Sequence, residues 1–203
     1  MANTKRERRR LVFQLKVTLR GIRPPIWRRI QVTGDTTLHQ LHRILQTTMG
    51  WYGGHLHEFD VFGTPYGDPA MLEDGVVLDE KKVRLDRLVS EEKERFHYLY
   101  DFGDSWEHEI LVEKIIPPEK GTTYPVCLTG KRACPPEDCG GPWGYEELLE
   151  ALKDPSHEDH EEMQEWVDED FDPNRFDAEE INRRLNPPVR KRNWTWGGNT
   201  PTA

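Results

Sequence analysis

A short span near the middle of the chain concentrates the residue types that do chemistry. From Tyr98 to His108 the sequence reads Tyr-Leu-Tyr-Asp-Phe-Gly-Asp-Ser-Trp-Glu-His, so two carboxylates and an imidazole stand among aromatic rings. Upstream, His55 and His57 are two residues apart, a spacing that places both side chains on one face of a strand. Imidazole and carboxylate together suit zinc, iron or manganese, and they also serve anion binding or acid/base catalysis.

These residues predict a binding site whose members are His55, His57, Asp101, Asp104, Trp106 and His108. Turn chemistry is the alternative interpretation, because Asp is a common turn former whose carboxylate caps nearby backbone amides. A buried histidine that hydrogen-bonds a neighbouring aspartate is equally ordinary. The two interpretations differ in whether the side chains converge on one pocket.

The three cysteines are a second candidate for metal chemistry, and they are Cys127, Cys134 and Cys139. Structural zinc takes four ligands, commonly from closely spaced pairs, so the last two cysteines have a permissible spacing and a histidine would complete the set. The histidines that could do so are His97, His108, His157 and His160. The alternative is that the thiols are simply buried or lie in a constrained loop. Zinc or another divalent transition metal is thus the cofactor that the sequence suggests.

The elements that position the central span form a predicted β-hairpin. Aromatic residues alternate from Phe96 to Phe102, and Gly103-Asp104 supplies the turn. Trp106, His108 and Ile110 alternate on the returning strand. Near the N-terminus, alternation from Leu11 to Leu19 predicts a half-buried strand, and Ile26 to Val32 predicts a second strand returning beside it. These two strands supply a sheet with which the central hairpin can pair.

A helix follows the first two strands. Asp35 or Thr36 can cap it, its apolar residues recur at helical spacing from Leu38 to Met49, and Gly50 ends it. This strand-strand-helix order is similar to the start of a β-grasp fold. A further strand is predicted from Leu56 to Phe62, before a polar connection over residues 63–80.

The C-terminal third changes in composition. A loop over residues 117–142 carries all the cysteines, and an acidic helical part follows over about 143–186. Pro155 ends its first helix, Ser156 can cap a second, and Asp177 caps a third with Glu180 three residues later. The sequence therefore predicts an α+β fold with a mixed β-sheet, a β-grasp-like start and a C-terminal helical cap.

Composition predicts one soluble, cytoplasmic domain over residues 11–188. The chain has 203 residues, of which 32% are charged and 35% hydrophobic, and no run approaches the ~18 apolar residues of a membrane span. The start of the chain lacks the pattern of a signal peptide. The odd number of cysteines excludes a complete set of disulfides within one chain and favours a reducing compartment.

Charge is distributed unevenly along the chain, whose formal net charge is −9. Residues 144–180 hold sixteen Asp and Glu against only Lys153 and Arg175, whereas the predicted tails over residues 1–10 and 189–203 are basic. The C-terminal tail also carries two tryptophans, so these tails could contact nucleic acid. Solvated, disordered tails are the alternative. A protein partner is also possible, and no membrane contact is expected.

Three ordered motifs give a family resemblance. Trp51 with His55-Leu56-His57, the central hairpin, and the segment from Ala133 to Tyr145 occur in this order. On them the chain resembles the plasmid pRiA4b ORF-three-like family, also known as an insertion-element passenger protein, over residues 11 to about 185. The resemblance implies an α+β fold and an association with mobile elements, and it assigns no role to individual residues.

We therefore expect a binding or accessory protein associated with mobile elements and without enzymatic activity, which uses the hairpin as its recognition surface. One alternative is a metal-dependent hydrolase that uses the same His and Asp residues to activate a bound water. Another is nucleic-acid binding through the basic ends.

Overall fold

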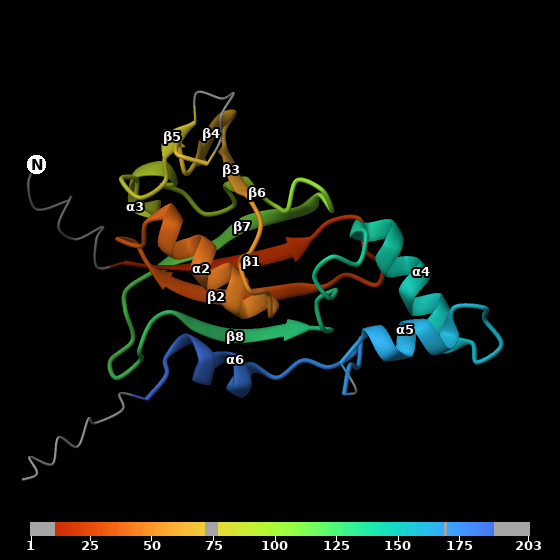
Figure 1. Cartoon of the computed structure of the whole chain (residues 1–203). Coiled ribbons are helices and arrows are strands. Elements are labelled where there is room, and N and C mark those ends of the chain that lie inside the picture. Colours follow the sequence, from red (N-terminus) through yellow and green to blue (C-terminus); the bar gives the residue numbers. More distant parts are fainter. Residues whose placement is uncertain (1–10, 72–76, 169, 189–203) are drawn as a thin grey trace, which may run out of the picture.

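The computed structural model describes residues 11–71, 77–168 and 170–188, so the two predicted tails lie outside the described residues. Its centre is an eight-stranded sheet in the order β5-β4-β3-β6-β7-β1-β2-β8 (Figure 1). Neighbouring strands are antiparallel except for β4 and β5, which are parallel. The predicted α+β class with a mixed sheet is confirmed.

The first two strands form the predicted hairpin, which lies between β7 and the edge strand β8. β1 (Val12–Leu19) pairs with β2 (Trp27–Thr33) on one side and with β7 (Trp106–Ile116) on the other. The polar residues of β1 are less exposed than simple alternation predicts, because they form hydrogen bonds with side chains of the neighbouring strands. Gln14 donates to Glu113 and accepts from Gln31, at 2.9 and 3.1 Å.

Helix α2 (Leu38–Met49) has the predicted length and lies across one face of the sheet (Figure 1). Its N-cap is Thr37, which forms a capping box with Gln40. The prediction of Asp35 or Thr36 as the cap is wrong, because Thr36 still belongs to the preceding turn and donates its backbone N–H to the carbonyl of Thr33. Gly50 ends the helix with a left-handed φ of 94°.

The central hairpin is confirmed as β6 (Arg95–Tyr100) and β7, with Tyr98 opposite His108 and Tyr100 opposite Trp106. Phe102 leaves the aromatic face, because the strand ends at Tyr100 and the Phe102 side chain lies in the turn at 42% exposure. β3 (His57–Val61) pairs with β6. His55 therefore precedes the strand instead of sharing a strand face with His57.

The connection predicted as polar and irregular contains short elements at the far edge of the sheet. These are β4 (Thr64–Gly67), β5 (Leu78–Asp79) and, further on, α3 (Leu85–Leu88). The cysteine loop also contains an unpredicted element, since β8 (Val126–Lys131) holds Cys127 and pairs with β2. The three unpredicted strands are short. β8 pairs with β2, which is distant in sequence, whereas β4 returns on β3 after only Phe62 and Gly63.

The C-terminal helices cover one end and one edge of the sheet (Figure 1). α4 (Gly141–Lys153) packs against α5 (His160–Trp166), while α6 (Ala178–Leu185) lies beside the edge strand β8. Asn182 of α6 accepts from the N–H of Cys127 at 2.7 Å and donates to its carbonyl at 2.8 Å. The side chain thus satisfies polar groups of the edge strand.

The helix starts give one confirmed and one corrected prediction. Asp177 caps α6 by accepting from the backbone N–H groups of Glu179 and Glu180. Ser156 does not cap α5, whose N-cap is Asp159, because the Ser156 hydroxyl instead donates to Asp154 at 2.7 Å. Within the described residues, no helix has the length and apolar character needed to cross a membrane.

Candidate functional site

One imidazole and two carboxylates meet where the central hairpin turns. We define the hairpin mouth as His55, in the bend before β3, Asp101, just after β6, and Asp138, in the loop before α4. His55 Nδ1 lies 3.5 Å from Asp101 Oδ2, and His55 Nε2 lies 3.3 Å from Asp138 Oδ1. Across the described parts of the chain, this is the only trio of His, Cys, Asp or Glu with ligand atoms within 4.8 Å of one another.

Asp101 both stabilises the hairpin turn and contacts His55. Its Oδ1 accepts from the N–H groups of Gly103 and Asp104, at 2.9 and 3.3 Å, which leaves Oδ2 directed at His55. A carboxylate oriented by hydrogen bonds to one oxygen is a common arrangement for a metal ligand. Asp101 and Asp138 also both have left-handed backbone, with φ of 56° and 60°, a conformation that recurs at binding sites.

Glu137 fixes the loop that carries Asp138. Its carboxylate accepts a short hydrogen bond from the hydroxyl of Tyr100 and a second one from the backbone N–H of Tyr52, at 3.2 Å. Burial and the neighbouring Glu137 carboxylate raise the pKa of Tyr100, so the phenol stays a proton donor. The loop is thereby attached both to β6 and to the segment that leads to His55.

The start of α4 packs directly on the hairpin turn. A Cβ on Gly141 would collide with the carbonyl oxygen of Asp104, so only glycine permits this approach, and its φ is 71°. This contact explains the second glycine of the pair that follows Cys139. It also holds Asp138 beside the turn, because the loop is anchored on both sides of that residue.

The hairpin mouth is open to solvent on one side. The side chain of Asp138 is 72% exposed and that of His55 is 32% exposed, whereas that of Asp101 is 10% exposed. One imidazole with two carboxylates fits zinc, iron or manganese, and the exposed side would leave room for water as a further ligand. The alternative is a structural clasp, in which the three side chains only stabilise one another and bind no ligand.

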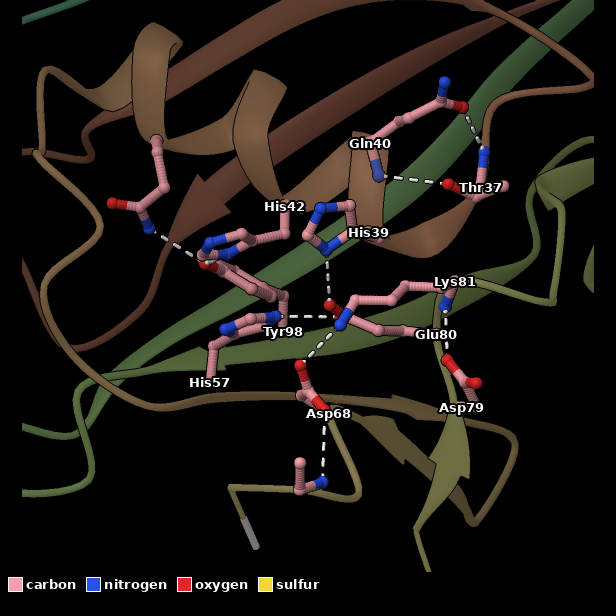
Figure 2. A network of polar contacts seen from close by, with 12 residues as sticks. Thr37, His39, Gln40, His42, His57, Asp68, Asp79, Glu80, Lys81 and Tyr98 are labelled. Carbon is pink, nitrogen blue, oxygen red and sulfur yellow. Dashed lines mark hydrogen bonds and ion pairs between the residues drawn. The ribbon is translucent and has the colours of Figure 1, made fainter.

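A second group of imidazoles lies beside the sheet, and we call it the histidine–glutamate network (Figure 2). The side chain of His57 is 12% exposed, whereas that of His39 is 38% exposed. The Glu80 carboxylate, 1% exposed, accepts from His39 Nδ1 and from His57 Nε2, both at 2.8 Å. The ring of His42 stacks on that of His57 with centroids 3.5 Å apart and planes 6° apart. The Tyr98 hydroxyl lies 2.8 Å from His42 Nδ1.

Burial sets the charges of this network. It lowers the pKa of His42 to about 3, aided by the neighbouring His57, so the ring is neutral and accepts from Tyr98. Burial also raises the pKa of Glu80, but the hydrogen bonds from His57 and His39 outweigh it, and the net shift is downward. Glu80 is therefore an anion that two imidazoles stabilise.

The other four predicted site residues contribute no ligand atom to the hairpin mouth. His108 is fully buried, with Nδ1 3.3 Å from the carbonyl oxygen of Tyr98, and burial lowers its pKa to about 4. Trp106 is fully buried against Trp51, with ring centroids 6.0 Å apart. Asp104 is half-buried at the α4 contact. The structure thus brings together two of the six residues, His55 and Asp101.

The cysteines do not form a group of metal ligands within the described residues. Cys134 Sγ lies 3.2 Å from Arg28 Nη2 and 3.2 Å from Met49 Sδ, and Cys127 lies in β8 beneath α6. Burial raises the pKa of Cys127 to about 11 and that of Cys139 to about 12. The thiols are therefore neutral at physiological pH, which disfavours them as nucleophiles.

The sequence reasoning missed five contributors to these two groups, namely Glu80, His39, His42, Glu137 and Asp138. A signal existed for His42, which lies four residues after Leu38 and so falls on the apolar stripe of the helix. A polar residue on such a stripe has a buried partner. No local pattern marks Glu80 or Asp138, because both lie in irregular segments.

Comparisons with known proteins agree on one family. The model of the plasmid pRiA4b ORF-3-like protein family matches residues 11–180. The uncharacterized protein y4hQ of Sinorhizobium fredii is 41% identical over 182 residues, which are 89% of this chain and 93% of that protein. The crystal structure of a protein of unknown function, MM3350 from Methanosarcina mazei Go1, superimposes with a TM-score of 0.76 and 42% identity, covering 83% of this chain and 96% of that one.

Proposed function

Because the chain belongs to the plasmid pRiA4b ORF-3-like family, whose matched relatives carry no stated activity, we propose from its geometry that the protein binds a divalent transition metal ion at the hairpin mouth. The function is then that of a binding module without enzymatic activity. The observation that carries the proposal is the convergence of His55, Asp101 and Asp138, which come from three separate segments.

Three features support a metal ion over a simple clasp. The contacts of His55 with its two carboxylates are long, at 3.5 and 3.3 Å, and lie beyond the usual range of hydrogen-bond distances. Two residues adopt left-handed backbone, at a cost of about 1 kcal/mol each. Exposed contacts of this kind contribute little to stability, so stability alone does not account for the arrangement.

Calorimetric titration of the full chain with Zn²⁺ and with Mn²⁺ tests the proposal. We expect one ion to bind per chain, and we expect His55→Ala and Asp138→Asn each to lower the affinity by about tenfold or more, since each removes a ligand. Matched controls are His97→Ala and Asp35→Asn, which change exposed residues of the same types elsewhere. Equal affinity in all four variants, or no stoichiometric binding, would contradict the proposal.

Metal-dependent hydrolysis is the second candidate function. It is favoured by the exposure of Asp138 and His55, which leaves one side of the hairpin mouth free for a metal-bound water. This candidate predicts hydrolysis of ester or phosphoester model substrates that requires metal and stops on chelation. Metal binding without such activity would leave the binding module as the function.

Two expectations from the sequence remain predictions. Nucleic-acid binding through the basic ends concerns residues outside those that the structure describes. It predicts an affinity that falls steeply with salt and is lost when both ends are removed. The association with mobile elements, which the family resemblance implies, is likewise a prediction, and the proposed metal site does not depend on it.

A further inference from the structure

A groove separates α4 from α5 at the end of the molecule next to the hairpin mouth. Its volume is ≈ 630 Å³, and α4, α5 and the loop between them line it together with Asp138 and Cys139. Leu148 and Ala151, both buried, and the partly buried Met163 give it an apolar floor. Of these three residues, Met163 supplies the apolar surface that a ligand can contact, and the groove is wider than a single ion needs.

The charged side chains along this groove have one sign. They are Asp138, Glu147, Glu150, Glu158, Asp159 and Glu162, and no Lys or Arg lines the groove. Within the described residues, none of these carboxylates pairs with Lys or Arg, and the ion pairs that they make are with His55 and His157. The negative charge is therefore available to an external cation.

An exposed aromatic ring stands at the edge of the same groove. Trp166, the last residue of α5, is 46% exposed and lines this groove as well as a neighbouring one. The neighbouring groove also holds Arg28, Arg175 and Arg184, so its charge is mixed. A tryptophan face beside carboxylates suits a guanidinium or ammonium group through a cation–π contact.

We infer that the groove between α4 and α5 is a docking site for a Lys/Arg-rich segment of a partner protein. Basic side chains of such a segment would pair with the rim carboxylates, one of them would stack on Trp166, and its apolar residues would lie over Met163. Charge complementarity selects this occupant. Nucleic acid is disfavoured, because its phosphates would face carboxylates alone.

Fluorescence anisotropy with the full chain tests this inference. The probe is a labelled peptide that alternates Arg and Leu, and its matched control alternates Glu and Leu. We expect the basic peptide alone to bind, with an affinity that falls as salt rises. The double variant Glu147→Lys/Glu162→Lys should weaken binding by about tenfold or more, and Trp166→Ala by several-fold. Asp35→Lys/Glu91→Lys, with the same change in net charge, should retain most of the affinity.

Two results would overturn the inference. One is equal weakening by the groove pair and the control pair, which would show that the peptide responds only to net charge. The other is tighter peptide binding after removal of residues 189–203, which would identify the chain's own basic end as the occupant. The variant Asp138→Asn distinguishes this inference from the proposed metal site. It removes a metal ligand and leaves five of the groove carboxylates in place.

Discussion

Two groups that each combine imidazole with carboxylate differ in their contact distances and in the exposure of their carboxylates. In the histidine–glutamate network the Glu80 carboxylate is 1% exposed and both imidazole contacts measure 2.8 Å. In the hairpin mouth the imidazole contacts measure 3.5 and 3.3 Å, and the Asp138 side chain is 72% exposed. The first group has the distances and burial of a structural element. The second is loosely paired and accessible.

The difference separates the His–carboxylate contacts that stabilise the fold from those that are available to bind a ligand. A buried polar group must be hydrogen-bonded, because an unpaired one costs about 1–3 kcal/mol. The network meets this requirement for Glu80, and so it holds α2 to the sheet and to the segment after β5. An exposed pair contributes about 0–1 kcal/mol, so the hairpin mouth can exchange its internal contacts for a ligand at little cost to the fold.

Acidification should have the largest effect, and it acts through buried histidines. The folded-state pKa is about 3 for His42 and about 4 for His108, whereas an unfolded histidine titrates near 6.5. The unfolded chain therefore binds more protons below that pH, so stability is full above about pH 6.5 and is lost as pH falls. We expect a loss on the order of 5 kcal/mol by pH 4.

Urea unfolding across this pH range measures the effect. A variant that cannot charge at one of these positions, His42→Gln, should show a shallower pH dependence than the wild-type protein. A flat stability between pH 6.5 and pH 4.5 would contradict the assignment of neutral, buried imidazoles.

Removal of the Glu80 carboxylate should have the next largest effect. Glu80→Ala leaves the ring N–H groups of His39 and His57 without their acceptor, and we expect a loss of about 3 kcal/mol in the free energy of unfolding. Glu80→Gln keeps one acceptor oxygen and should cost less. Chemical denaturation at pH 7 compares the two, and a loss below about 1 kcal/mol in Glu80→Ala would show that the network is dispensable.

A smaller effect is expected at the far end of the network. Tyr98→Phe removes the hydroxyl that lies 2.8 Å from His42 Nδ1 and accepts from Gln46 Nε2 at 2.9 Å. Two buried groups lose one partner while the ring packing is kept, so we expect a loss of about 1–2 kcal/mol. Phe96→Leu is a packing control on the same strand face, and thermal unfolding ranks the two variants.

The smallest effect on stability belongs to the hairpin mouth. His55→Ala should change the free energy of unfolding by about 0.5 kcal/mol or less, although it should abolish most metal affinity. Denaturation in the presence of a chelator measures the first quantity without a contribution from bound metal. A loss above about 1.5 kcal/mol would mean that the mouth is a structural clasp after all, and the contrast between the two groups would disappear.

Local patterns in the sequence predicted the elements that have strong periodicity. Alternation located β1 and the central hairpin, and helical spacing located α2 apart from its N-cap, which is Thr37 instead of Asp35 or Thr36. The same patterns failed for β8 and for β4, which are short and flanked by Pro and Gly. The strand conformation of β8 depends on pairing with the distant β2, which no local signal contains, whereas β4 follows β3 through the turn at Phe62 and Gly63.

The candidate site was predictable only in part, for a related reason. Asp101 lies in the hairpin turn and His55 lies just before β3, so their contact follows from the pairing of β3 with β6. Asp138 joins them because Gly141 packs on Asp104 and Glu137 binds Tyr100, contacts that depend on the position of α4. His57 looks equivalent to His55 in sequence, but the strand begins between them, and its side chain turns to Glu80 instead.

X-ray absorption spectroscopy of the zinc-loaded full chain tests the central claim most directly, because it reads the ligand atoms of the bound ion. Binding at the hairpin mouth predicts a shell of nitrogen and oxygen at about 2.0–2.1 Å with the multiple scattering of one imidazole, and no sulfur. A sulfur shell near 2.3 Å would place the ion on the cysteines. That result, or a chain that retains no zinc, would contradict the account.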